Sequence, residues 1–141
     1  MHGTTTIVAA AVLAATSIAS LAQTFPSRPI RLVVPLAPGG TNDTIARMIS
    51  DRMADKLGQQ IIVDNRPGAN SKIGSALVAK ANADGHTLLM TGAGHATNPS
   101  LHRTLPYDTE RDFAPISVVA GGPYLMVIPP AIQAKWVKEF V

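Results

Sequence analysis

The first regular pattern along the chain is an apolar, β-branched run from Ile30 to Val34. A run of this kind predicts a strand that is covered on both faces, as in a parallel sheet. A stretch with helical periodicity follows, in which the apolar residues are Ile45, Met48, Ile49, Met53 and Leu57. We expect Thr41 or Asn42 to cap this helix, and Lys56 followed by Gly58 to mark its end.

The same two patterns then repeat and lead into a third strand. Residues 60–65 predict a second strand, and Pro67 with Gly68 predicts a turn. A shorter helix follows, with Asn70 or Ser71 as its cap, Gly74 as a point of close packing, and an apolar side formed by Ile73, Leu77, Val78 and Ala81. A turn at 84–85 leads into a third strand within 83–91. The order βαβαβ predicts an α/β fold with a mostly parallel sheet flanked by helices.

Beyond this region the pattern becomes irregular. A short helix is predicted around 98–102, then a polar connection at 105–112 and two apolar runs at 116–120 and 124–128. Trp136, Val137 and Phe140 have helical spacing at the end of the chain. Because this last helix would end without a cap, we expect that more protein once followed. The 141 residues are enough for one ordinary globular domain and too few for a second.

The amino-terminal segment has the composition of a secretory leader. The first 27 residues contain no Lys, Arg, Asp or Glu, and Ile7 to Ala15 is an apolar run. Small residues follow, so we interpret 1–22 as a signal peptide with cleavage near Gln23 and expect a periplasmic protein. A membrane anchor is the alternative, although the apolar run is shorter than the ~20 residues that a spanning helix needs.

Charge and composition exclude several function classes. The net charge is +3, but the 12 basic residues are interspersed with 9 acidic ones and form no block of the kind that binds nucleic acid. Aromatic residues make up 4%, too few for base stacking, so we expect no nucleic-acid partner. The absence of cysteine excludes disulfides, iron–sulfur clusters and thiolate zinc sites.

Ligands of open parallel sheets bind beyond the carboxyl ends of the strands, which directs attention to the loops after the first and third strands. These loops read PLAPGGTND and TGAGHATNP, and neither contains Lys or Arg. They offer backbone N–H groups at helix starts and neutral side chains that suit a carboxylate: Thr41, Asn42, Thr91, His95 and Asn98. A purely steric role for the first turn is the alternative. Neither a Walker loop nor the GxGxxG fingerprint is present.

The sequence contains no evident catalytic or metal-binding set. His86, His95 and His102 have no Glu or Asp at a ligand-like spacing, and no serine lies in a GxSxG elbow. The acidic cluster at 108–112 is most simply a solvated connection. We therefore expect a protein that is not an enzyme, with no catalytic residues, no metal and no cofactor.

Several motifs in combination carry a resemblance to a known family. They are S-R-P-I-R, V-P-x-A-P-G-G-x-x-D, D-N-R-P-G-A, A-D-G-x-T-L-L, H-A-x-N-P-S-L, L-P-Y-D and D-F-A-P-I, in this order from about Phe25 onward. With these motifs the chain resembles the Bug family, the substrate-binding receptors of tripartite tricarboxylate transporters. The resemblance implies a periplasmic-binding-protein fold of two α/β lobes. The lobes would close on a small organic carboxylate and present it to membrane permease subunits.

The resemblance also implies which residues hold the ligand. In the first loop they are Ala37, Pro38, Gly39, Gly40, Thr41 and Asp43, and in the second Thr91, Gly92, Ala93, His95, Ala96 and Asn98. In receptors for amino acids, an acidic residue at the position of Asp43 meets the ammonium group. A role for Asp43 as a favourable charge at a helix start is equally consistent with the sequence.

The chain departs from the family in length, at one helix start, and at His86, where Tyr is commoner. Members of the family are about twice as long, so we expect a signal peptide at 1–22, most of the first lobe at 23–100, and a crossover with the start of a truncated second lobe at 101–141. GANSKIG also replaces the usual GAGGNIG. With one wall of the cleft missing, affinity is expected to be poor. The alternatives are an α/β enzyme or anion-binding module that uses the Gly-Gly loop on a phosphate, and a non-functional fragment.

Overall fold

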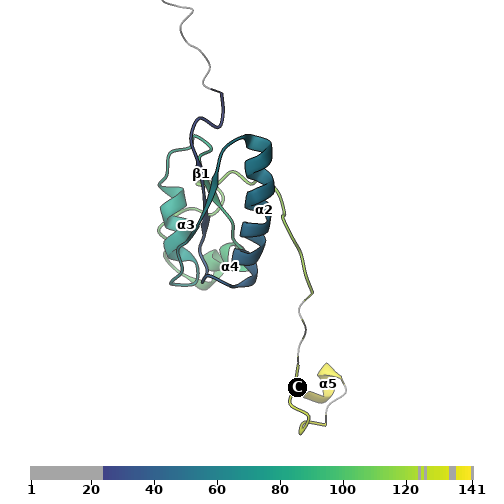
Figure 1. Cartoon of the computed structure of the whole chain (residues 1–141). Coiled ribbons are helices and arrows are strands. Elements are labelled where there is room, and N and C mark those ends of the chain that lie inside the picture. Colours follow the sequence, from purple (N-terminus) through teal and green to yellow (C-terminus); the bar gives the residue numbers. More distant parts are fainter. Residues whose placement is uncertain (1–23, 124, 126, 134–135, 141) are drawn as a thin grey trace, which may run out of the picture.

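The computed structural model describes residues 24–123, 125, 127–133 and 136–140. Its centre is a sheet of parallel strands in the order β2-β1-β3, consisting of β1 (Ile30–Val34), β2 (Ile61–Asn65) and β3 (Thr87–Leu89). This arrangement confirms the predicted βαβαβ order and the parallel sheet (Figure 1). Because the strands are parallel, their carboxyl ends meet at one edge.

The helix α2 (Thr41–Leu57) covers one face of the sheet. Its apolar stripe, with Ile45, Ile49 and Met53, packs against a buried cluster of strand residues that includes Ile30, Leu32, Val34 and Ile61. The end of α2 confirms the prediction, since Gly58 closes it with a left-handed φ of 66°. The predicted cap was wrong: Gly40 is the N-cap residue, and Thr41 and Asn42 already lie in the first turn.

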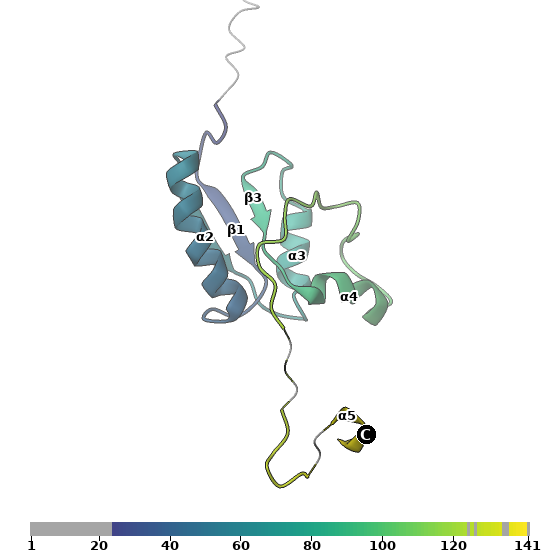
Figure 2. The same cartoon turned by 90° about the vertical axis from the view of Figure 1, so that its right-hand side faces the viewer.

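The opposite face carries α3 (Lys72–Ala79), with α4 (Ala93–Leu101) close to it, so that the sheet lies between α2 and this pair (Figure 2). Gly74 is a point of close packing, as predicted. A Cβ atom there would lie 2.7 Å from Cβ of Pro35 and 2.9 Å from the carbonyl oxygen of Arg66. Glycine therefore allows α3 to approach the chain that leaves β1.

The helix α4 corrects the prediction of a short helix at 98–102, because it begins already at Ala93 and ends at Leu101. Its first residues are small and show no apolar periodicity, and Pro99 lies inside it. Local pattern therefore gave no signal for the early start. Packing of the interior residue Asn98, whose side chain is fully buried, holds the helix instead.

The carboxyl-terminal part is extended and largely exposed. Ile116 and Val118 are 80% and 88% exposed, and the apolar runs form no strand among the described residues. The short helix α5 (Val137–Phe140) lies where helical spacing was predicted, next to the exposed Trp136. The division into lobes near residue 100 stays a prediction.

The predicted signal peptide at 1–22 lies outside the described residues. Within the part of the chain that the structure describes, none of the helices has the length and apolar character needed to cross a membrane.

Candidate functional site

The first candidate loop connects β1 to α2 at the carboxyl edge of the sheet. Gly39 has a positive φ of 78°, and Gly40 leads into the helix without a side-chain hydrogen bond to cap it. The first amides of α2 are therefore not satisfied by a capping side chain. The amino-terminal end of a helix carries partial positive charge, which favours an anion at this place.

Asp43 ties this loop to the first turn of α2. Its buried carboxylate accepts a hydrogen bond from the Gly39 amide at 2.9 Å and one from Nε of Arg47 at 3.1 Å. The hydrogen bond from Arg47, followed by that from Gly39, lowers the pKa of Asp43 to about 2. The guanidinium of Arg47 also reaches Oδ1 of Asn65 at the end of β2, at 3.3 Å. Asp43 is thus ionised at neutral pH, and its charge is balanced by Arg47.

The second candidate loop leaves β3 and becomes the first turn of α4. Gly92 is the N-cap residue, again without a side-chain hydrogen bond. A Cβ atom on Gly92 would lie 3.5 Å from the side-chain nitrogen Nδ2 of Asn42, so the two helix starts are neighbours. The hydroxyl oxygen of Thr91 is buried here without a hydrogen-bond partner among the described residues. Such a group is costly unless water or a ligand satisfies it.

The twelve predicted site residues divide by exposure. Eight are exposed along the edge: Ala37, Pro38, Gly39, Gly40, Thr41, Gly92, Ala93 and Ala96. Thr91 and His95 are half-buried, whereas Asp43 and Asn98 are buried. The structure thus brings the two loops together but places two of the side chains in the interior.

Asn98 uses its whole amide within the protein. Its nitrogen donates to the carbonyl oxygen of Asn70 at 3.0 Å and lies 3.3 Å from the hydroxyl oxygen of Tyr107. Its side-chain oxygen accepts a hydrogen bond from the side-chain amide of Asn70 at 2.7 Å. With both its amide nitrogen and its oxygen bonded within the protein, Asn98 positions α4. It contributes to binding only by holding α4 in place.

His95 belongs to an aromatic cluster. Its ring stacks on Tyr107 with centroids 5.6 Å apart and meets the edge of Phe113 at 4.8 Å. Nδ1 lies 3.4 Å from the hydroxyl of Ser75, and burial lowers the pKa of the ring. His95 is therefore neutral at pH 7 and adds no positive charge to the site.

Sequence reasoning missed a third segment at this edge. Ala69, Asn70 and Ser71 have successive positive φ values of 47°, 53° and 70°. The turn lies close to α4, since a Cβ atom on Gly94 would be 3.7 Å from Oδ1 of Asn70. The available signal was the departure from the GAGGNIG that the family resemblance implies, because Asn and Ser stand at two positions whose positive φ glycine adopts most readily.

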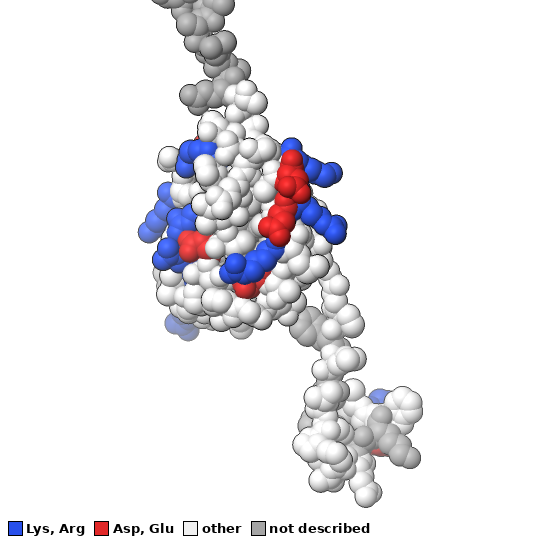
Figure 3. All heavy atoms as spheres, in the orientation of Figure 1, with Lys and Arg blue, Asp and Glu red and all other residues white. Residues whose placement is uncertain are grey.

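The structure offers no obvious metal-binding cluster in the described part of the chain, where no group of three His, Asp or Glu side chains could hold an ion. His86 is buried, with Nδ1 3.1 Å from the carbonyl oxygen of Asp84 and its ring against Phe25. On the face that Figure 3 displays, acidic and basic side chains are interleaved.

Comparison with known proteins decides the family. Residues 45–141 match the TctC family, described as the tripartite tricarboxylate transporter family receptor. The chain belongs to this family. The chain is 45% identical over 126 residues to the UPF0065 protein in the tcbD-tcbE intergenic region of Pseudomonas sp. strain P51, a match that covers 87% of this chain and 38% of that relative.

Solved structures of the receptor family share the fold. The periplasmic binding protein BugD is 40% identical, with a TM-score of 0.63 over 65% of this chain and 31% of BugD. MatC from Rhodopseudomonas palustris with bound malate is 38% identical, with a TM-score of 0.62 over 67% of this chain and 33% of MatC. The chain thus spans well under half the length of these receptors, and the matched part fits one lobe of a periplasmic-binding-protein fold.

Proposed function

We propose that this receptor-family chain binds a small organic carboxylate at the carboxyl edge of its sheet, between the first turns of α2 and α4. The observation that carries the proposal is the pair of neighbouring helix starts, at Gly40 and Gly92, that no side chain caps. Neither loop contains Lys or Arg, so the carboxylate would be held by amide and hydroxyl groups. Binding of this kind is reversible, as a receptor that hands on its ligand requires.

The side chains around the two helix starts fit this role. The Thr91 hydroxyl has no partner among the described residues and is available to a carboxylate oxygen or an ordered water. Asp43 is balanced by Arg47, so its negative charge does not face the ligand alone. The proposed contacts are those predicted from sequence, except that the two buried residues act indirectly, Asp43 by fixing the loop before α2 and Asn98 by positioning α4.

The wider role in this proposal is periplasmic delivery of the carboxylate to the permease of a tripartite tricarboxylate transporter. The family description and the malate bound to MatC support it. We further propose that 1–22 is the signal peptide. Because the match covers 38% of the Pseudomonas relative, the activity of a whole receptor is itself part of the proposal.

The test is calorimetric and thermal-shift titration of the purified chain with malate, adipate and citrate, with ATP and inorganic phosphate as the opposing ligands. We expect stabilisation by at least one carboxylate and none by ATP. Stabilisation by ATP or phosphate alone would support the phosphate-binding alternative. Absence of any cooperative unfolding transition would identify a non-functional fragment.

A matched pair of threonine variants tests the site itself. Thr91→Val removes a buried hydroxyl that has no partner in the described structure, so stability should stay level or rise while carboxylate affinity falls about fivefold. Thr97→Val removes an exposed hydroxyl within α4 and should leave affinity unchanged. Equal affinities of the two variants would contradict the assigned position.

A further inference from the structure

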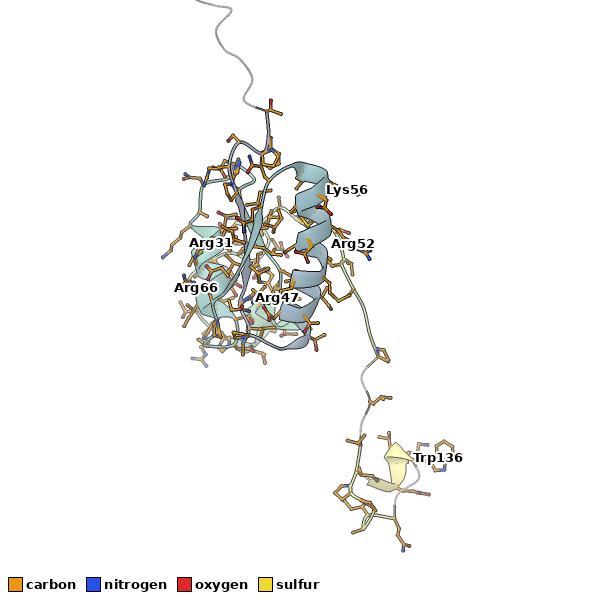
Figure 4. All side chains as sticks on the ribbon, viewed as in Figure 1. Arg31, Arg47, Arg52, Lys56, Arg66 and Trp136 are labelled. Carbon is orange, nitrogen blue, oxygen red and sulfur yellow. The ribbon has the colours of Figure 1, made fainter. Side chains whose placement is uncertain are left out.

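A second concave surface lies on the face of the sheet opposite α2. The helix α3 packs on this side over β3 and β1. Over β2 a groove of about 540 Å³ remains, which we call the arginine groove. It is lined by Arg28, Arg31, Ile62, Val63, Asp64 and Arg66. Figure 4 shows Arg31 and Arg66 on the side of the molecule away from Arg52 and Lys56 of α2.

The floor of the arginine groove is apolar. Arg31 pairs in register with Ile62, and Val33 with Asp64, so these residues share one face of the sheet. Val33 is buried completely, whereas Ile62 on the neighbouring strand is 48% exposed. Parallel sheets in α/β proteins are normally covered on both faces by helices. The floor therefore has the character of a surface that a helix covers.

The rim of the groove carries an excess of positive charge. Asp64 accepts hydrogen bonds from Arg31 at 2.7 Å and from Arg66 at 3.0 Å, so one carboxylate serves two guanidinium groups. Both arginine side chains stay partly exposed, at 38% and 50%. In the described structure Arg66 binds Asp64 through Nε, which leaves its outer N–H groups without an acceptor. Arg28, paired with Asp84, adds a third guanidinium.

We propose that the arginine groove docks an amphipathic helix that carries carboxylates. An apolar side chain of the helix would cover Ile62, and its carboxylates would pair with the guanidinium groups of Arg31 and Arg66. A small anion would leave the apolar floor exposed, so the combination of floor and rim favours a helix. Among the described residues, the three guanidinium groups at the rim face only the carboxylates of Asp64 and Asp84, so added carboxylates on the docked helix would complement the remaining positive charge.

The experiment uses two labelled 18-residue helical peptides with the same leucine stripe, one with Glu and one with Lys on its flanks. Anisotropy with the purified chain should show binding of the Glu peptide, weakened at least tenfold between 50 and 300 mM salt, and no binding of the Lys peptide. Equal binding of both peptides would overturn the proposal. Displacement of the bound Glu peptide by inorganic phosphate at constant ionic strength would also overturn the proposal, in favour of a small-anion site.

Variants locate the contact. Arg31→Gln with Arg66→Gln should lower the affinity for the Glu peptide at least tenfold, while Arg52→Gln with Lys56→Gln on α2 removes the same charge and should have no effect. If the first pair fails to fold, Ile62→Ser provides the test, because this half-exposed residue can be changed without opening the core. Unchanged binding by Ile62→Ser would overturn the proposal. Carboxylate binding between the first turns of α2 and α4 is measured separately and does not depend on this outcome.

Discussion

Replacing Ser71 with glycine should stabilise this protein, although Ser71 is buried and only 5% exposed. Ser71 precedes α3 with φ 70° and ψ −2°, and its hydroxyl makes no capping hydrogen bond to the helix. The left-handed conformation costs a residue with a side chain about 1–2 kcal/mol. Glycine adopts this conformation without that cost.

The net gain is smaller because glycine also raises the conformational entropy of the unfolded chain. That effect opposes the gain by about 0.4–1 kcal/mol, which leaves about 0.5–1 kcal/mol in favour of Ser71→Gly. For a domain of this size the midpoint of thermal unfolding should rise by roughly 2–8 °C. Urea and thermal denaturation of the purified chain, followed by circular dichroism, measure both quantities.

Two further variants separate backbone strain from side-chain loss. Asn70→Gly relieves a φ of 53° but removes the hydrogen bond to Asn98, so it should destabilise the protein. Ser100→Gly lies in α4 and should cost about 0.5 kcal/mol. A Ser71→Gly protein less stable than the wild type would refute the reasoning, as would equal stabilisation by Asn70→Gly.

Three other changes test the packing and the charges. Gly74→Ala should lower the free energy of unfolding in urea by about 1–3 kcal/mol, because the new Cβ meets backbone atoms. Gly121→Ala should be neutral, because a Cβ atom there has nothing within 4 Å. Equal effects of the two variants would contradict the close approach of α3. Asn98→Ala should cost about 2 kcal/mol or more, because buried hydrogen bonds to Asn70 are lost; a neutral effect would show that the network does not hold α4. The pKa of Asp43 is lowered from the usual 3.8 to about 2, so its contribution to stability is complete above pH 4 and is lost as the pH falls toward 2. Acid titration of Asp43→Asn should therefore show a smaller loss between pH 4 and 2 than the wild type, and identical acid profiles would contradict the assignment.

The sequence by itself determined the framework of this protein. The β-branched run at 30–34 and the periodic stretch that Gly58 ends are local patterns, and local sterics and burial are enough to specify them. The βαβαβ order then implied a parallel sheet with its loops gathered at one edge. The family could be named from short motifs because each motif is contiguous in the chain.

The tertiary structure alone decided how the side chains at that edge and on the sheet face are used. Asn98 looked available in a polar loop, but it is buried against Asn70, which lies 28 residues away. The Arg31–Asp64 pair joins residues 33 positions apart and exists only because β1 and β2 lie side by side. Partners this distant leave no periodic trace in the sequence, since burial and hydrogen bonding depend on which segments the fold brings together.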